Sequence, residues 1–183
     1  MPLYPVFLHL RERPVLLVGG GRVAAGKLDG LIEAGARVTV VAPEIRPELV
    51  RPDVRLAPRA FEAADLDGKW LAVAAATPEV NRAVALAAET RGIFVNAVDD
   101  TDSASAYLGS VVRKAGVTVA VSTDGRAPAL AGLLREALEA VLPDDLDQWV
   151  EAALRLRSRW RADKVPFADR RPQLLRALQE IYR

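Results

Sequence analysis

The sequence predicts an α/β fold in which an N-terminal parallel sheet precedes a small hairpin-plus-helix region and a C-terminal helical tail. Three observations predict this order. Strand and helix signals alternate over the first hundred residues, as in successive strand–helix–strand units. The strand segments are continuous apolar runs, which indicates a sheet buried on both faces. An alternating hairpin pattern follows, and then helical stretches bounded by prolines.

The first strand–helix–strand unit begins with the strand RPVLLV and ends with the strand ARVTVVAP. Apolar residues recur between them with helical spacing, at Val23, Leu28, Leu31 and Ile32. Ala34-Gly35 is typical of a helix end. We therefore expect two parallel strands joined by a crossover helix.

The next elements extend the same sheet. VRLAPRAF is a candidate short strand, and KWLAVAAA is an apolar run of the kind found in fully buried strands. Pro78 suits the first turn of a helix that runs to about Thr90, and GIFVNAV predicts the next strand. These elements place a doubly wound domain at residues 1–105.

The rest of the chain divides at Pro143. SVVRKAGVTVAVST alternates about Lys-Ala-Gly and predicts a hairpin, and ALAGLLREALEAVL predicts a helix opened by Pro128. Two further helices are expected at about residues 145–161 and 170–182. The hairpin-and-helix region is thus residues 106–143, and the helical, basic C-terminal region is residues 144–183.

Composition narrows the class of protein. The chain has 183 residues, of which 51% are hydrophobic and 27% charged, which suits a packed globular core. A formal net charge of +1 gives no chain-wide reason to expect a nucleic-acid partner. With no Cys and one His, disulfides and thiolate nucleophiles are excluded and no resident metal is expected. Without a signal-peptide pattern or a bilayer-length apolar run, we expect a cytoplasmic protein with no membrane partner.

The C-terminal region is basic. From Glu151 to Arg183 the chain carries nine Arg or Lys residues against four acids. A solvated helical face and a surface for a polyanionic ligand both explain this excess. Nucleic acid is the less favoured polyanion because no aromatic stacking pattern accompanies the basic residues.

The stretch VLLVGGGRVAAGK, residues 15–27, fits two phosphate-binding templates. Gly21, Gly26 and Lys27 match the G-x-x-x-x-G-K of a nucleoside-triphosphate loop. Such a loop needs a Mg²⁺-binding hydroxyl after the lysine, where this chain has Leu28. The neighbouring strand KWLAVAAAT also ends without the acid that the same metal requires. The triphosphate interpretation therefore fails on two requirements.

Gly19, Gly21 and Ala24 instead give G-x-G-x-x-A between a strand and a helix, the setting of a Rossmann-type dinucleotide site. There the first glycine permits a tight turn, the second lets the backbone approach the pyrophosphate, and the alanine allows close helix packing. A turn with a purely structural role is the alternative. The second strand ends in VVAPE, where Glu44 is either a ribose-binding acid or a surface residue, so NAD and NADP both stay open.

Three carboxylates follow GIFVNAV, at a strand end where ligands gather in open α/β sheets: Asp99, Asp100 and Asp102. Asp99 follows the strand directly and is the candidate base facing a nicotinamide. The other two are expected to cap a turn or a helix. The single histidine, His9, is expected to have a structural or surface role, so catalysis must rely on carboxylates, hydroxyls or backbone.

Four segments carry a family resemblance: YPVFLHLRERPVLLVGGGRVAAGKLDGLIEAGARVTVVAPE, KWLAVAAATPEVN, NAVDD and VTVAVSTDGRAPALAGLLREALE. In this order they resemble the siroheme synthase family over residues 4–143. The resemblance implies NAD-dependent oxidation of precorrin-2 to sirohydrochlorin, a step towards siroheme or cobalamin, and in many members insertion of Fe²⁺ as well. It also implies a homodimer, with the hairpin and the following helices as the dimerisation region, and a polycarboxylate tetrapyrrole as substrate.

Roles for single residues follow from the motif, the strand ends and the resemblance. Asp99 matches the catalytic aspartate of the family, which accepts a proton while a hydride leaves the macrocycle. The expected cofactor-binding residues are Gly19, Gly21, Arg22, Val23, Pro43, Glu44 and Thr77. The expected substrate-binding residues are Ser122, Thr123, Arg126 and Arg113, the arginines as partners of substrate carboxylates.

The chain also departs from the family pattern. AYLGS, residues 106–110, stands where the family has Phe-Ile-x-Pro, so Gly109 replaces a proline. Gly26 replaces an arginine, and Ala127 replaces the serine before Pro128. These changes bear more on iron insertion than on NAD binding. Three functions stay open: a dehydrogenase, a bifunctional dehydrogenase and ferrochelatase, and a non-catalytic NAD-sensing Rossmann module.

Overall fold

The computed structural model describes residues 3–183, and the chain divides into two compact units, Met1–Leu108 and Gly109–Arg183. The first unit holds a five-stranded parallel sheet, and the second holds a two-stranded hairpin and three α-helices. The predicted α/β fold class is confirmed, with sheet, hairpin and C-terminal helices in the expected order. The further boundary between residues 143 and 144 stays a prediction.

The sheet of the first unit has the strand order β3-β2-β1-β4-β5, with every neighbouring pair parallel. Helix α1 connects β1 to β2, and α2 connects β4 to β5, while the 3-10 turns η1 and η2 flank β3. The bounds are β1 Pro14–Val18, α1 Arg22–Glu33, β2 Arg37–Val41, η1 Pro47–Leu49, β3 Arg55–Ala57, η2 Ala63–Leu66, β4 Leu71–Ala74, α2 Pro78–Glu89 and β5 Phe94–Ala97.

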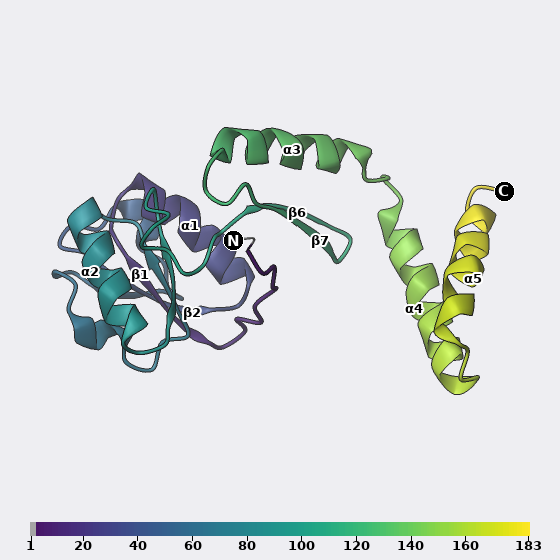
Figure 1. Cartoon of the computed structure of the whole chain (residues 1–183), viewed down its shortest axis with the longest axis horizontal. Helices are drawn as coiled ribbons and strands as arrows, with labels where there is room; N and C mark the ends of the chain where they lie inside the picture. The colour runs from purple at the N-terminus through teal and green to yellow at the C-terminus, as the bar shows by residue number, and fades with distance from the viewer. Residues whose placement is uncertain (1–2) are drawn as a thin grey trace. The chain divides into compact units, whose positions relative to one another are not determined.

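Helices cover both faces of this sheet (Figure 1). Successive strand residues point to opposite faces, so Val15 and Leu17 of β1 pack on the α1 side and Leu16 and Val18 on the α2 side. All four are at most 2% exposed. Burial of each such side chain contributes about 1.5–3 kcal/mol, which explains why the run VLLV reads as continuously apolar. The predicted doubly wound arrangement is confirmed.

The second unit begins with the hairpin of β6, Ser110–Lys114, and β7, Val117–Val121. Its two turn residues, Ala115 and Gly116, have φ of 50° and 77°. Positive φ at both positions matches the twist of the strands, as in type I′ hairpins. Helix α3, Pro128–Val141, packs on both strands of the hairpin.

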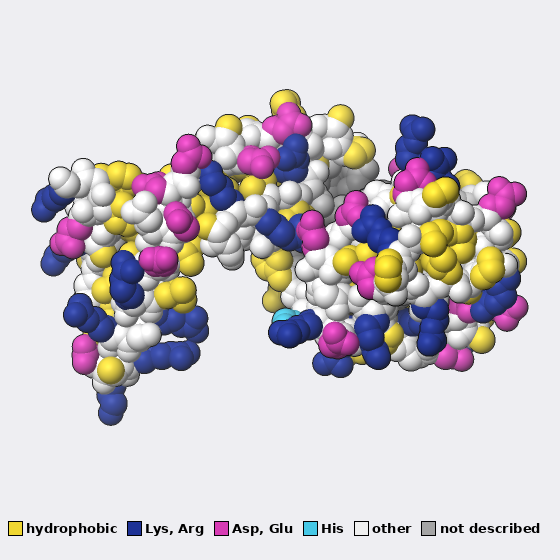
Figure 2. All heavy atoms as spheres, turned by 180° about the vertical axis from the view of Figure 1, so that it is seen from behind, with side chains coloured by type: hydrophobic (Ala, Val, Ile, Leu, Met, Phe, Trp, Pro, Cys, Tyr) yellow, Lys and Arg dark blue, Asp and Glu magenta, His cyan; other side chains and the backbone are white. Residues whose placement is uncertain are grey.

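Helices α4, Leu146–Ala162, and α5, Phe167–Glu180, pack against each other as a helical hairpin. Trp149 Nε1 donates a hydrogen bond of 2.6 Å to the Tyr182 hydroxyl, and Trp160 Nε1 donates one of 2.7 Å to Gln173 Oε1. Helix α5 begins three residues before the predicted start and accommodates Pro172 in its interior. Lys and Arg side chains gather on this helical hairpin (Figure 2).

No helix in the described part of the chain, residues 3–183, has the length and apolar character needed to cross a membrane.

Candidate functional site

The carboxyl ends of four strands meet at one edge of the parallel sheet. Their last residues pair in one row, Val41 with Val18, Val18 with Ala74, and Ala74 with Ala97. Backbone hydrogen bonds continue past the row, since Ala75 N donates to Val18 O at 2.7 Å. The connections that leave this edge therefore start side by side. The strand order reverses between β1 and β4, which is where open α/β sheets bind ligands.

The loop after β1 is built from three glycines that meet different constraints. Gly19 has φ +127°, and a Cβ there would overlap the carbonyl oxygen of Ala75. A Cβ at Gly20 would overlap the carbonyl oxygen of Glu44. Gly21 faces open space: apart from its chain neighbours, no residue of 3–183 has an atom within 4 Å of a Cβ built on it. The first two glycines thus let the loop pass closely between the ends of β4 and β2, and the third leaves the entrance of α1 open.

Helix α1 presents its N-terminus to that open space. Gly21 is its N-cap residue and has no side chain to cap the helix, and the first turn contains no acid. The free N–H groups and the positive end of the helix dipole favour an anion at this position. Arg22 and Val23, both exposed, begin the helix, while Ala24 is fully buried. This cradle fits the pyrophosphate of a dinucleotide.

The neighbouring strand ends add exposed side chains to this edge. Pro43 and Glu44 follow β2 and are exposed, and Thr77 is the exposed N-cap residue of α2. The pKa of Glu79 lies below its ordinary value because its own backbone N–H and the Thr77 hydroxyl hydrogen-bond to its carboxylate. An ionised acid in the first turn of α2 is favourable to the helix dipole.

Asp99 lies in the turn directly after β5. Its φ is +58°, a left-handed conformation that Asp and Asn adopt more readily than other residues with a side chain. The Asp99 side chain is exposed, and no other residue of 3–183 makes a hydrogen bond or ion pair with it. Asp100 instead accepts a hydrogen bond from Ser103 N at 3.1 Å. Hydrogen bonds from the Ser103 side chain and backbone hold the pKa of Asp100 below its ordinary value. Asp100 therefore has the turn-capping geometry that was expected of it. Asp99 is the carboxylate of this turn that stays available to a ligand.

A buried amide connects this turn to the loop after β4. Asn81 of α2 is 3% exposed. Its Oδ1 accepts a hydrogen bond of 3.0 Å from Ala76 N, and its Nδ2 donates one of 3.2 Å to Val98 O. Asn81 thus touches the residue before Thr77 and the residue before Asp99.

The substrate-binding candidates lie in the second unit, where hydroxyl groups support a loop. Ser122 Oγ accepts a hydrogen bond of 3.1 Å from Asp124 N, and Thr123 Oγ1 accepts one of 3.2 Å from Ala127 N. Asp124 and Gly125 have φ of 55° and 73°, so the loop turns sharply before α3. Exposed Arg126 lies 3.5 Å from Asp124, close enough for a weak ion pair. Arg113 is an exposed residue of β6.

Comparison with known protein families supports the geometry of the first unit. A family model described as "Putative NAD(P)-binding" matches residues 6–110, more than half of the chain. The chain belongs to this NAD(P)-binding family. The predicted dinucleotide cofactor is thereby confirmed as a nicotinamide dinucleotide.

The relatives of this NAD(P)-binding protein include several siroheme synthases. Siroheme synthase 1 of Aeromonas salmonicida is 44% identical over 176 residues, which cover 93% of this chain and 38% of the relative. The siroheme synthase of Citrobacter koseri is 44% identical over 172 residues, covering 91% of this chain and 38% of the relative. The predicted resemblance is confirmed. The chain spans little more than a third of the length of these relatives.

A solved structure shares the fold. SirC, precorrin-2 dehydrogenase, superposes with a TM-score of 0.70 at 23% identity and covers 95% of this chain and 88% of its own. At that identity the likeness concerns the fold, including the order of parallel sheet, hairpin and helices.

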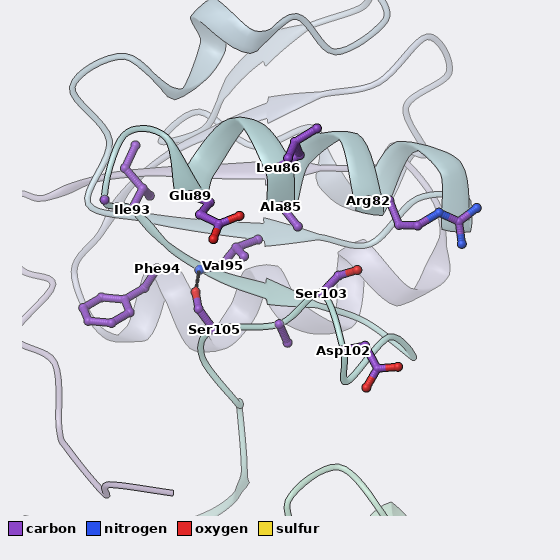
Figure 3. Close-up of a pocket in the computed structure, with 12 residues that line it drawn as sticks. Arg82, Ala85, Leu86, Glu89, Ile93, Phe94, Val95, Asp102, Ser103 and Ser105 are labelled. Atoms are coloured by element: carbon purple, nitrogen blue, oxygen red, sulfur yellow. Dashed lines mark hydrogen bonds between the residues drawn. The ribbon is translucent and has the colours of Figure 1, made fainter. Parts of the chain in front are cut away.

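The NAD(P)-binding domain also has a groove (Figure 3) whose lining includes no residue of the glycine loop. It runs between α2 and residues 102–105, beside edge strand β5. The backbone N–H of Val95 donates a hydrogen bond of 2.8 Å to Ser105 Oγ, so this segment occupies part of the strand edge. Asp102 lines the groove, whereas none of the predicted cofactor-binding residues does.

The first unit therefore brings together the predicted residues at the ends of β1, β2, β4 and β5. Ser122, Thr123, Arg126 and Arg113 belong to the other unit, and their role with substrate stays a prediction. Sequence reasoning missed Asn81. Its only signal in the sequence is that asparagine, a weak helix former, occupies the fourth position of the helix that begins at Pro78. Its hydrogen-bond partners are backbone groups, which leave no pattern in the sequence.

Proposed function

We propose that the chain is an NAD-dependent precorrin-2 dehydrogenase that oxidises precorrin-2 to sirohydrochlorin. One observation carries the proposal: an open glycine cradle and a left-handed aspartate, whose side chain has no partner among residues 3–183, leave the same edge of the sheet. Two further findings support it. The relatives that are 44% identical are named siroheme synthases, and the similar fold is that of a precorrin-2 dehydrogenase.

Different residues bind the pyrophosphate and the ribose of the cofactor. The N–H groups at the start of α1 bind the pyrophosphate, and Gly21 leaves room for it. Glu44, exposed after β2, is the proposed acceptor for a ribose hydroxyl, which favours NAD because a carboxylate repels a 2′-phosphate. When bound, NAD⁺ supplies the two-electron acceptor that takes a hydride from the macrocycle.

Asp99 supplies the base. Oxidation of precorrin-2 removes two hydrogens, one as a hydride and one as a proton, and the electron pair left by the proton extends the conjugation of the macrocycle. The ionised Asp99 carboxylate accepts that proton on a side-chain oxygen. Its exposed position and lack of a side-chain partner among residues 3–183 leave both oxygens available. General-base catalysis of this kind contributes about 10²–10⁴-fold in rate.

The second unit supplies the remaining proposed contacts. The hydroxyls of Ser122 and Thr123 already accept backbone hydrogen bonds, and each retains a hydrogen to donate to a substrate carboxylate. Arg126 and Arg113 are exposed cations suited to the carboxylates of a tetrapyrrole. We place the enzyme in the cytoplasm as a homodimer.

The decisive experiment is an anaerobic assay of the intact protein with precorrin-2 and NAD⁺, followed through the visible spectrum. Sirohydrochlorin formation is expected. Asp99→Asn is expected to lower kcat by about 10²–10⁴-fold, since a side-chain amide cannot act as a base near neutral pH. Asparagine tolerates left-handed φ, so the turn should survive and the Kd for NAD should stay within about twofold.

Asp102→Asn is the matched control, because it removes an exposed acid three residues away without touching Asp99. It should leave kcat unchanged. Absence of sirohydrochlorin with the unaltered protein would contradict the proposal and favour a non-catalytic NAD-sensing module, which predicts indifference to Asp99→Asn. Addition of Fe²⁺ to the same reaction tests the bifunctional alternative, in which siroheme appears as a second product.

A further inference from the structure

Asn81 is a buried side chain whose two polar atoms both serve the candidate site. It is 3% exposed, and its Oδ1 and Nδ2 bond to backbone groups that belong to two different strand ends. An unpaired amide in such a position would be costly, whereas this one is paired at both ends. Helix α2 gains nothing from an asparagine at an interior position, where Ala, Leu or Glu forms helix better. The residue therefore suits a tertiary role.

We propose that Asn81 is a positioning residue that fixes the backbone turn carrying Asp99, an inference that rests on the proposed dehydrogenase function. The turn comprises Ala97, Val98, Asp99 and Asp100. Asp99 has positive φ and Val98 does not, which is the pattern of a type II turn. Type I and type II turns differ by a flip of the central peptide, here the one between Val98 and Asp99. The carbonyl of that peptide is the group that Asn81 Nδ2 holds.

The turn has little else to hold this peptide in place. The hydrogen bond that closes it, from Asp100 N to Ala97 O, is long at 3.5 Å. In a type I turn Asp99 would have φ near about −90°, where most residues are comfortable. A flip of the central peptide would therefore relieve the left-handed backbone and redirect the Asp99 carboxylate. The hydrogen bond from Asn81 opposes that flip.

The other half of the amide holds the loop after β4. Ala76 N donates to Asn81 Oδ1, and Thr77, the next residue, begins α2. One side chain thus sets the position of the base through its donor and the position of a cofactor-contacting loop through its acceptor. Removal of the donor alone and removal of both functions should have different kinetic effects.

Asn81→Asp keeps an acceptor for Ala76 N and loses the donor only when its carboxyl is ionised. The ionised carboxylate repels Val98 O, whereas the protonated carboxyl donates to Val98 O as the native amide does. Burial raises the pKa of such a carboxyl into the range of about 6–9. The ratio of the variant's kcat to the native kcat should therefore fall about tenfold to a hundredfold as the pH rises through that range, with the Kd for NAD within about threefold.

Asn81→Ala removes donor and acceptor together. It should lower kcat by about tenfold to a hundredfold at every pH and also raise the Kd for NAD several-fold, as measured by calorimetric titration. Asn96→Ala is the matched control, since Asn96 is also buried, at 8% exposed, and donates a hydrogen bond of 3.0 Å to Ala106 O, away from the turn. That variant should lose stability while keeping kcat within about threefold.

Equal kcat in folded Asn81→Ala and Asn96→Ala, or a ratio for Asn81→Asp that does not change with pH, would overturn the inference. If Asn81→Ala does not fold, the pH dependence of Asn81→Asp decides the question alone. If the native protein does not oxidise precorrin-2, the proposed function fails separately. A crystal structure of Asn81→Asp above about pH 9, where the introduced carboxyl is ionised, then decides: a flipped peptide at Val98 supports the inference, and retention of positive φ at Asp99 contradicts it.

Discussion

Gly19 and Gly21 lie two residues apart, but the absence of a side chain makes room for the protein's own backbone at Gly19 and for a ligand at Gly21. At Gly19 the space belongs to the protein, because the carbonyl oxygen of Ala75 fills it and the backbone has φ +127°. At Gly21 the space is open and is bordered by the N-terminus of α1. The motif G-x-G-x-x-A predicts both glycines, and the structure separates a folding role from a binding role.

These two roles predict that alanine substitutions at Gly19 and Gly21 affect different properties of the protein. Gly19→Ala should lower the free energy of unfolding by about 1–3 kcal/mol, because strain and overlap act in the cofactor-free protein. Gly21→Ala should change it by less than about 0.5 kcal/mol and still weaken NAD binding about tenfold or more. Urea denaturation and calorimetric titration measure the two quantities. A Gly21→Ala variant that binds NAD normally would show that the pyrophosphate does not approach this residue.

At the scale of elements, apolar runs predict the central strands β1 and β4, because burial on both faces leaves a direct mark on the sequence, whereas the edge strand β3 is only partly buried and carries a weaker pattern. Ends of elements are harder to predict, since register with neighbours decides them. KWLAVAAA stays apolar through Ala76, but the strand β4 ends at Ala74, where its partners β1 and β5 also end. Asn81 was missed for a related reason: its partners are backbone groups 5 and 17 residues away, which no side-chain pattern marks.

The 3-10 turn η2, between β3 and β4, is an element that no periodic pattern in the sequence predicts. A capping box stabilises it, with the Glu62 side chain bonded to the backbone of Asp65 and Asp65 Oδ2 accepting from Glu62 N at 2.9 Å. Arg59 also donates two hydrogen bonds to Asp65, of 2.9 and 2.5 Å. The hydrogen bonds from Arg59, followed by that from the Glu62 backbone, hold the pKa of Asp65 below its ordinary value.

Asp65 should therefore make stability depend on pH. A carboxyl whose pKa is lower in the folded state contributes stability above its unfolded pKa of about 3.9, and this contribution is lost as the pH falls through the folded value. Asp65→Asn should lower the free energy of unfolding by about 1 kcal/mol at pH 7. Urea denaturation of both proteins should show the difference shrinking below about pH 4. A difference that is the same at pH 7 and at low pH would mean that the charge of Asp65 is not what stabilises the turn.

At the scale of the whole molecule, helix α3 carries an apolar face that its own unit does not bury. Ala131 is 5% exposed, whereas Leu130, Leu133, Leu134 and Val141 are 42–79% exposed. Apolar residues gathered on one helix are typical of an interface between protein chains. The face lies in the region that the family resemblance assigns to dimerisation. Burial of this face in the proposed homodimer would explain why these leucines are exposed in a single chain.

Leu133→Glu should convert the proposed dimer to a monomer, because it places a charge in an apolar interface that leaves the carboxylate unpaired. Leu86→Glu on α2 is the matched control: Leu86 is 68% exposed and Leu133 is 62% exposed, so each substitution costs the folded chain little by itself. Sedimentation equilibrium should give twice the chain mass of 19.8 kDa for the native protein and for Leu86→Glu, and a single chain mass for Leu133→Glu. A native protein that sediments as one chain would contradict the homodimer. Dissociation by Leu86→Glu with Leu133→Glu still dimeric would instead place the interface on the α2 side of the first unit.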